Sequence, residues 1–182
     1  MIVFANPCTG KTQAIHRLKL GALEINNANF FNFLKLKKDR EVEKCINQII
    51  KVEEENLLFS MYLPDIYMDM LLQKIEKKRV FLCGFGLSYR DTIKENVENR
   101  KKSDILRGAS SIISDTWGEE STIEKEFKEF LFYHKKYPEC NFIQLMPGEY
   151  LASALERIPE IEKYIERKLD KRKLKEQASL LL

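Results

Sequence analysis

The sequence has few of the residues that mark fibrous, low-complexity or cross-linked proteins. Among its 182 residues there are only 7 glycines and 5 prolines, which excludes collagen-like and low-complexity chains. The four cysteines, Cys8, Cys45, Cys83 and Cys140, are far apart and include no CxxC pair. This spacing argues against a zinc site and against a disulfide framework, so we expect reduced thiols.

The sequence also lacks the features of membrane and secreted proteins. No stretch approaches the roughly 18 consecutive apolar residues that suggest a membrane-spanning helix. The first residues have neither the charged start nor the long apolar core of a signal peptide. The formal net charge is only +3, too small a surplus to indicate nucleic-acid binding by itself. We therefore expect a soluble, cytoplasmic protein with no membrane partner and no nucleic-acid partner.

The composition supplies enough apolar material for a core. Hydrophobic residues make up 44% of the chain and aromatic residues 10%, which suffices for one compact domain. Short apolar runs indicate buried strands at 2–5, 23–25, 80–83, 111–114 and 141–146. The run 57–62 is compatible with a strand or a helix.

Helical patterns alternate with these strands. Between residues 40 and 55 the apolar positions follow the spacing i, i+3, i+4, i+7, i+8. Similar patterns predict helices around 14–18, over 65–78, over 89–100, from the capping box Ser121-x-x-Glu124 onward, and twice after Pro147. Such an alternation is typical of a parallel sheet covered on both faces. We predict a three-layer α/β fold with about five mostly parallel strands and a helical C-terminal extension.

One segment between the first strand and the first helix carries chemistry. It fits the permissive form of the phosphate-binding loop, with alanine where glycine is usual. The loop consists of Ala5, Asn6, Pro7, Cys8, Thr9, Gly10, Lys11 and Thr12. A loop that enters a helix N-terminus offers unpaired backbone N–H groups to phosphate oxygens. An ordinary strand-to-helix turn with a surface lysine is the alternative interpretation.

Four residues of this loop have separate expected roles. Gly10 permits close approach of the backbone, Lys11 reaches the β- and γ-phosphates, and the Thr12 hydroxyl can bind Mg²⁺. Cys8 lies where a helix N-terminus tends to lower the pKa of a thiol. A redox role and simple filling of the loop are both compatible with that cysteine.

Through this motif the sequence resembles the P-loop NTPase superfamily. It is similar there to the small nucleoside or nucleotide kinase-like proteins of phages and plasmids, through residues 148–151 after the last strand and residues 89–91 at a helix start. The resemblance implies a nucleotide-binding domain over residues 1–155 that binds ATP or another NTP with Mg²⁺. Residues 156–182 are then expected to form a basic amphipathic helix packed on that domain.

A kinase also needs an acid near the magnesium ion and an arginine near the phosphates. Asp115, after the predicted strand 111–114, is the candidate acid, and a capping role is the alternative. Arg90 is the candidate arginine, and a surface salt bridge is the alternative. Residues 100–102 and Arg107 are compatible with a lid that closes on phosphates or with a solvated basic turn.

These assignments predict phosphoryl transfer from an NTP to a nucleoside, a nucleotide or a similar small acceptor. The predicted catalytic residues are Lys11, Arg90 and Asp115, with Thr12 and Asp115 as metal ligands. Asn26 and Asn27 stand where related kinases often carry aspartate, and an amide cannot take a proton at neutral pH. Two alternatives therefore stay open: a non-catalytic nucleotide-binding or interaction module, and an NTPase that acts on a protein partner.

Overall fold

A parallel β-sheet forms the centre of the computed structural model, which describes residues 1–18, 23–24, 39–106, 115–167 and 170. The strand order is β2-β3-β1-β4-β5, and every neighbouring pair is parallel. The strands are β1 (Ile2–Ala5), β2 (Leu23–Glu24), β3 (Leu58–Ser60), β4 (Val80–Phe85) and β5 (Asn141–Leu145). β2 is a two-residue edge strand, so the other four form the body of the sheet.

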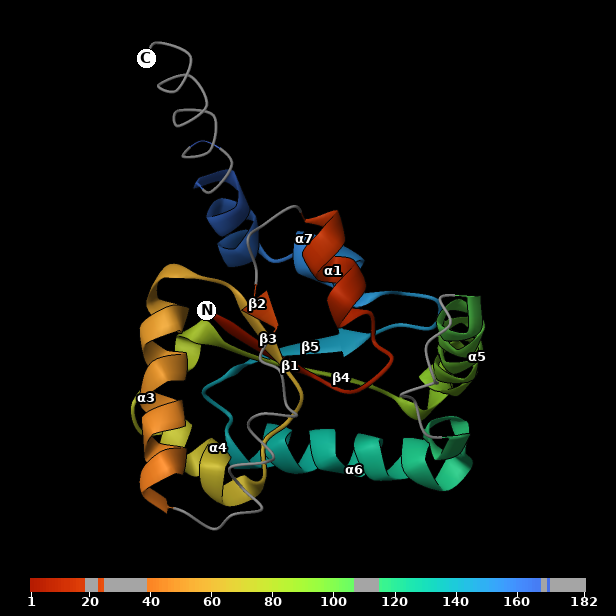
Figure 1. The fold of residues 1–182 in the computed structure, drawn as a ribbon, viewed down its shortest axis with the longest axis horizontal. Coiled ribbons are helices and arrows are strands. Elements are labelled where there is room, and N and C mark those ends of the chain that lie inside the picture. The colour runs from red at the N-terminus through yellow and green to blue at the C-terminus, as the bar shows by residue number, and fades with distance from the viewer. Residues whose placement is uncertain (19–22, 25–38, 107–114, 168–169, 171–182) are drawn as a thin grey trace.

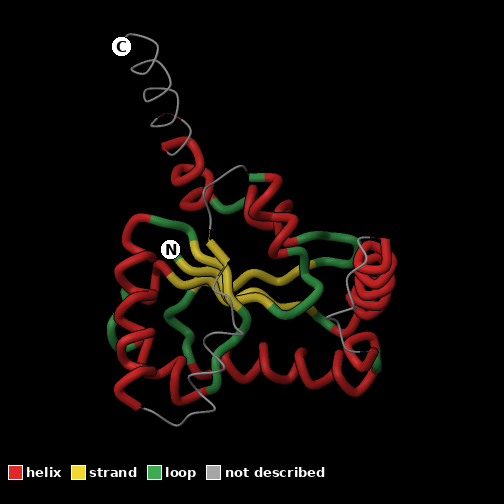
Figure 2. Tube along the Cα trace, in the orientation of Figure 1, coloured by secondary structure: helices red, strands yellow, loops and turns green. Residues whose placement is uncertain are grey.

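Helices cover this sheet on both faces. They are α1 (Lys11–Arg17), α3 (Asp39–Glu55), α4 (Asp65–Leu72), α5 (Arg90–Leu106), α6 (Glu120–Lys136) and α7 (Leu151–Glu156), followed by helical residues 159–167. Figure 1 shows α1 and α7 on one face, α4 and α6 on the other, and α5 beyond the carboxyl ends of the strands. Figure 2 shows the strands enclosed between these helices. The prediction of an α/β fold with a parallel sheet is confirmed.

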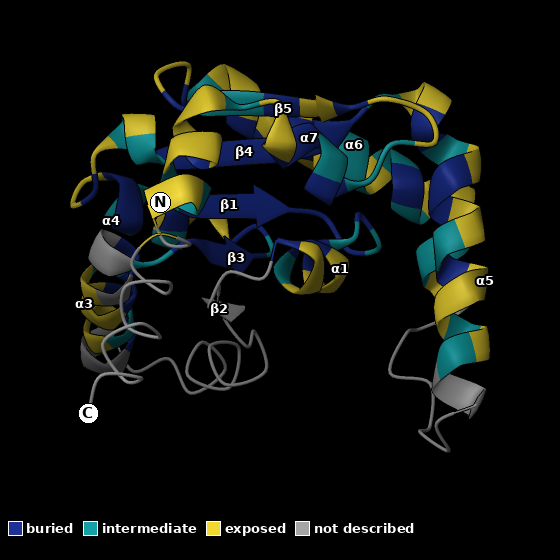
Figure 3. Cartoon of the chain, turned by 90° about the horizontal axis from the view of Figure 1, so that it is seen from above, coloured by how far each residue is buried: buried dark blue, intermediate teal, exposed yellow. Residues whose placement is uncertain are grey.

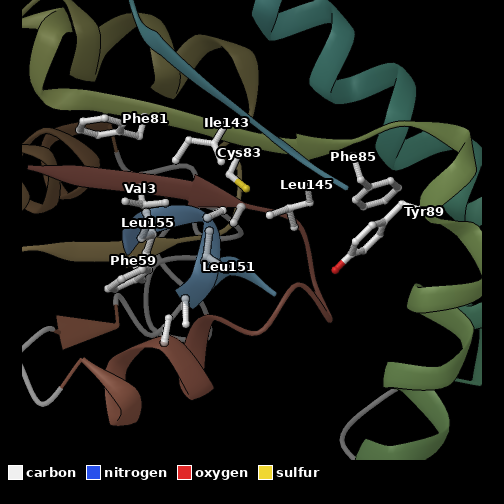
Figure 4. Packing of buried hydrophobic residues seen from close by; sticks show 14 of the residues in the cluster. Val3, Phe59, Phe81, Cys83, Phe85, Tyr89, Ile143, Leu145, Leu151 and Leu155 are labelled. Carbon is white, nitrogen blue, oxygen red and sulfur yellow. The ribbon is translucent and has the colours of Figure 1, made fainter. Parts of the chain in front are cut away.

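The strand residues are buried because both faces of the sheet are covered. β1, β3 and β4 consist entirely of buried residues (Figure 3). Side chains alternate across the pleat, so Val3 and Ala5 enter one core while Ile2 and Phe4 enter the other. Figure 4 shows the first core, where strand side chains meet α7. Two cores explain why the strands of the sequence are continuous apolar runs.

Helix α6 approaches β4 closely at one point. A Cβ atom on Gly84 would lie 2.0 Å from Cγ of Phe130 on α6. Gly84 continues the alternation of Val80 and Leu82, which face the second core together with Phe130. Glycine inside a strand often marks such a close approach. The absence of a side chain at Gly84 therefore sets the distance between α6 and the sheet.

The ends of several elements differ from the sequence prediction. β4 continues to Phe85, because Gly84 and Phe85 are buried strand residues and not a stop signal. The ambiguous run 57–62 contains β3, which pairs with β1. α4 ends at Leu72 and not near residue 78, because the chain turns there and buries Ile75 in the second core before β4.

Two further predictions concern the helices around the carboxyl ends of the strands. α5 continues to Leu106, so residues 100–102 lie in a helix and not in a turn. The capping box is wrong: α6 begins at Glu120 with Glu119 as its N-cap, so Ser121 and Glu124 already lie inside the helix. Residues 111–114, Arg107, Asn26 and Asn27 lie outside the described residues.

The start of the predicted C-terminal helix contacts the rest of the chain. Ile161 is fully buried in the first core, and Ile158 and Ile165 pack against it. The backbone N–H of Leu57 donates a hydrogen bond to the hydroxyl of Tyr164 at 2.8 Å. These contacts attach residues 158–165 to the side of the sheet that carries α7.

We expect Gly84→Ala to destabilise the protein by about 1–3 kcal/mol, because the new methyl group overlaps the Phe130 ring and overpacks the core. Urea unfolding measures this loss. Gly118→Ala is the matched control, since its Cβ would meet no atom closer than 3.7 Å. Adding Phe130→Leu to Gly84→Ala should cost less than the sum of the two single changes. Simple additivity would contradict a direct contact.

Candidate functional site

The loop 5–12 leaves the sheet where the chain changes its direction of winding. From β1 the chain passes through α1 to β2 at one edge, whereas β4 and β5 lie on the other side of β1. In open α/β sheets, ligands bind outside the carboxyl ends of the strands at such a switch point. The loop therefore lies where this fold class places its ligand sites.

The backbone of the loop is sharply turned at two residues. Cys8 has a φ of 59° and Gly10 a φ of 94°, both in the left-handed region. Glycine adopts this region freely, whereas cysteine is strained there. The Thr9 hydroxyl donates a hydrogen bond to the Asn6 carbonyl at 2.8 Å. Turns of this kind gather backbone N–H groups into anion-binding concavities.

The side chain of Lys11 folds back toward the first residues of the loop. Its Nζ donates hydrogen bonds to the carbonyl oxygens of Ala5 and Asn6, both at 2.9 Å, and the residue is only 8% exposed. Burying an ammonium group costs free energy unless it is well bonded. The chain thus maintains a positive charge next to the turned backbone, which favours an anion at this place.

Two segments distant in sequence also reach the loop. Leu151 donates its backbone N–H to the Thr9 carbonyl at 3.1 Å, and the Tyr150 ring lies beside Gly10. From α5, the Asn96 side-chain amide donates to the Cys8 carbonyl at 2.9 Å. The structure therefore brings residues 148–151, on which part of the kinase resemblance depends, to the predicted phosphate loop.

Glu126 on α6 is a carboxylate near the loop that the sequence analysis missed. Its charge interacts with Lys11 and with Cys8. The residue is partly buried, and within the described part of the chain no hydrogen bond or ion pair holds its carboxylate. Burial raises the pKa of Glu126 to about 8; the neighbouring Glu129 adds to this shift, and Lys11 and Lys125 oppose it.

A signal for Glu126 was present in the sequence. It lies three residues after Ile123 and four before Phe130, and both of these apolar residues are buried. Helical spacing therefore places this glutamate next to the buried side of α6. A single charge beside an apolar helix face is common. The position of α6 on the sheet is therefore needed to show that this glutamate lies near the loop.

The thiol of Cys8 behaves in the opposite way to the sequence expectation. Burial raises its pKa to about 11, and Glu126 adds to this rise, whereas Lys11 and Arg100 oppose it. The thiol is therefore protonated at neutral pH, and a thiolate is the reactive form of cysteine. Filling of the loop is the role that this environment favours.

Asn6 is buried with an unsatisfied side chain. The residue is 1% exposed, and within the described part of the chain neither its Oδ1 nor its Nδ2 has a hydrogen-bond partner. Continuing the alternation of Ile2 and Phe4, it falls on the α6 side of the sheet. Buried polar groups without partners are rare in native proteins and call for an explanation. A bound polar ligand beside the loop would supply one.

The other predicted residues lie at the same end of the sheet. Arg90 opens α5, and its Nη2 pairs with the Glu120 carboxylate of α6 at 2.6 Å. Asp115 does not follow a described strand; it begins a 3-10 helix, η3 (Asp115–Gly118), that contacts α5 and α6. Thr12 is exposed in the first turn of α1, directly after Lys11.

The side chains at the loop can also be compared with the ligands that metal ions require. The described residues contain no group of three or more His, Cys, Asp or Glu side chains that could hold a metal ion. Mg²⁺ in nucleotide sites commonly takes one or two protein ligands, with phosphate and water oxygens completing its shell. Thr12, Asn6 and Glu126 each carry a side-chain oxygen atom of the kind that Mg²⁺ accepts.

Comparisons with family models and with curated proteins gave no match for this chain. No helix among the described residues is long and apolar enough to cross a membrane.

The raised pKa of Glu126 predicts a pH-dependent stability. Between the usual glutamate pKa of 4.5 and about pH 8, the folded protein binds one proton more than the unfolded chain. The stabilisation that this proton provides is therefore full below about pH 4.5 and is lost as the pH rises through 8. We expect the melting temperature of Glu126→Gln, measured relative to that of the parent, to increase as the pH is raised from 5 to 9. Differential scanning calorimetry measures this, with Glu124→Gln on the same helix as control. A difference that stays constant with pH would contradict the prediction.

Proposed function

We propose that the protein binds an NTP, expected to be ATP, with Mg²⁺ at the loop 5–12. We further propose that it transfers a phosphoryl group to a nucleoside, a nucleotide or a similar small acceptor, as a cytoplasmic enzyme of the P-loop class. The observation that carries this proposal is the turned loop at the carboxyl end of β1 with the Lys11 amine bonded across it.

Several features support phosphate as the ligand. Backbone N–H groups and a lysine beside a tight loop suit phosphate oxygens, because both donate hydrogen bonds and one carries full charge. Arg100 on α5 adds positive charge near Cys8. Phosphoryl transfer depends mainly on positioning and on stabilising the negative charge of the reacting oxygens. The Thr12 hydroxyl would bind the magnesium ion, which neutralises part of that charge when it is bound.

Residues 148–151 are suited to contact the rest of the nucleotide. Tyr150 places an aromatic ring beside Gly10, and Tyr89 donates a hydrogen bond from its hydroxyl to the Glu149 carbonyl. Gly148 donates its backbone N–H to Thr92 of α5 at 2.9 Å. These contacts hold the segment against the loop, where an aromatic face can stack on a base.

A non-catalytic nucleotide-binding module is the second candidate. The observation that favours it lies in the two strands beside β1: β3 ends at Ser60 and β4 at Phe85, so neither ends in an acid. A site without a suitable carboxylate would bind a nucleotide and leave it unchanged.

We expect Lys11→Ala to weaken ATP binding by on the order of 100-fold, because it removes the charge and the donors that meet the phosphates. The fold should lose about 2 kcal/mol, since the two hydrogen bonds from the lysine amine to backbone carbonyls are lost. Isothermal titration calorimetry with ATP and Mg²⁺ measures the affinity. Lys128→Ala, exposed on α6, is the control and should bind normally. Undiminished binding by Lys11→Ala would refute the phosphate-loop assignment.

A panel of acceptors separates the kinase from the binding module. With ATP and Mg²⁺ present, we expect ADP release to rise at least tenfold when one class of nucleoside or nucleoside monophosphate is added, because phosphoryl transfer then has its acceptor hydroxyl or phosphate. A coupled assay for ADP follows the reaction. ATP binding that raises the melting temperature, without turnover for any acceptor, would favour the module.

A further inference from the structure

The proposed function leaves one part of the site without an obvious residue. Nucleotide sites of this kind use a carboxylate close to the magnesium ion, yet neither β3 nor β4 ends in an acid. Asp115, the candidate from the sequence, opens η3, and the predicted strand 111–114 before it lies outside the described residues. A carboxylate on another element that reaches the loop is therefore a second candidate for this role.

Three observations point to the same side of the loop. Glu126 interacts electrostatically with Lys11 and Cys8, so it lies near the charged end of the site. Its carboxylate has no hydrogen bond or ion pair among the described residues. Asn6, in the same loop, is buried, and neither of its side-chain polar atoms has a hydrogen-bond partner among the described residues.

Helix α6 is attached to the rest of the protein on both sides of Glu126. Phe130, one turn after Glu126, packs into the space left by Gly84 on β4. At its other end, α6 is joined to α5 through the ion pair of Glu120 with Arg90. Glu126 lies between these two attachments, so its distance from the loop is set by the fold.

We propose that Glu126 is the carboxylate that faces the magnesium ion of the bound NTP, taking the role that no neighbouring strand end supplies. Thr12 on α1 and Glu126 on α6 would then both supply oxygen atoms to hold the ion. The side-chain amide of Asn6 would bond to a phosphate oxygen or to water in the same shell. This inference rests on the proposed function, because it requires a nucleotide at the loop.

A test can use known probes, Mn²⁺ in place of Mg²⁺ and a non-hydrolysable ATP analogue. Electron paramagnetic resonance measures free Mn²⁺, and calorimetry in EDTA measures the affinity for the metal-free analogue. For Glu126→Gln we expect the affinity for the Mn²⁺ complex to fall about tenfold or more. The metal-free affinity should stay the same, because Glu126 with a pKa of about 8 is mostly protonated at neutral pH when no cation is near, and glutamine has the same neutral charge.

Glu124→Gln, on the same helix and paired with Lys128, is the matched control and should stay within about twofold of the parent. Asp115→Asn tests the other candidate carboxylate. Glu126→Asp keeps the charge and should bind the Mn²⁺ complex better than Glu126→Gln, which guards against a variant that fails to fold. A parent protein that binds no analogue in either condition would overturn the proposed function and this inference with it. A parent that binds the Mn²⁺ complex, with no selective loss in Glu126→Gln or with the loss in Asp115→Asn instead, would overturn the inference alone.

Discussion

The contact between Phe130 and Gly84 is the constraint on which the site depends. A ring that occupies the place of a Cβ atom fixes α6 against β4 within narrow limits, because core packing tolerates neither a gap nor an added methyl group. The carboxyl ends of the strands, the loop after β1 and the N-terminal half of α6 therefore meet in one arrangement. A side chain at residue 84 would move α6 away and take Glu126 with it.

The same end of the sheet concentrates features that reduce stability. Cys8 has a strained backbone and Lys11 is a buried ammonium group. Among the described residues, the Asn6 amide and the Glu126 carboxylate have no hydrogen-bond partner. Each costs free energy in the isolated protein. Their gathering at one loop, while the two cores elsewhere are apolar, is the pattern expected where a protein keeps groups ready for a ligand.

The strands and the loop could be predicted because their signals are local. A buried parallel strand is a short apolar run, so β1, β2, β4 and β5 were found, whereas the three residues of β3 left helix and strand undecided. The motif of residues 5–12 needs only neighbouring residues. Element ends were missed where tertiary contact decides them: Gly84 is a stop signal in isolation and a packing position beside Phe130. Glu126 was missed for the same reason, since only the position of α6 brings it near the loop.

An acid on a helix has a different physical position from an acid on a strand. A residue at the end of a strand is held by the hydrogen bonds of the sheet, whereas Glu126 is held by side-chain packing and by the ion pair between Arg90 and Glu120. A ligand that binds most tightly at the observed distance between α6 and the loop also stabilises the packing of Phe130 against Gly84. This follows because binding and conformation are thermodynamically linked. The charge of Glu126 follows from the same geometry: as long as it stays partly buried near Glu129, the proton is favoured, and only a nearby cation reverses that preference. The position of α6 therefore couples the packing of the second core to the charge of the proposed phosphate site.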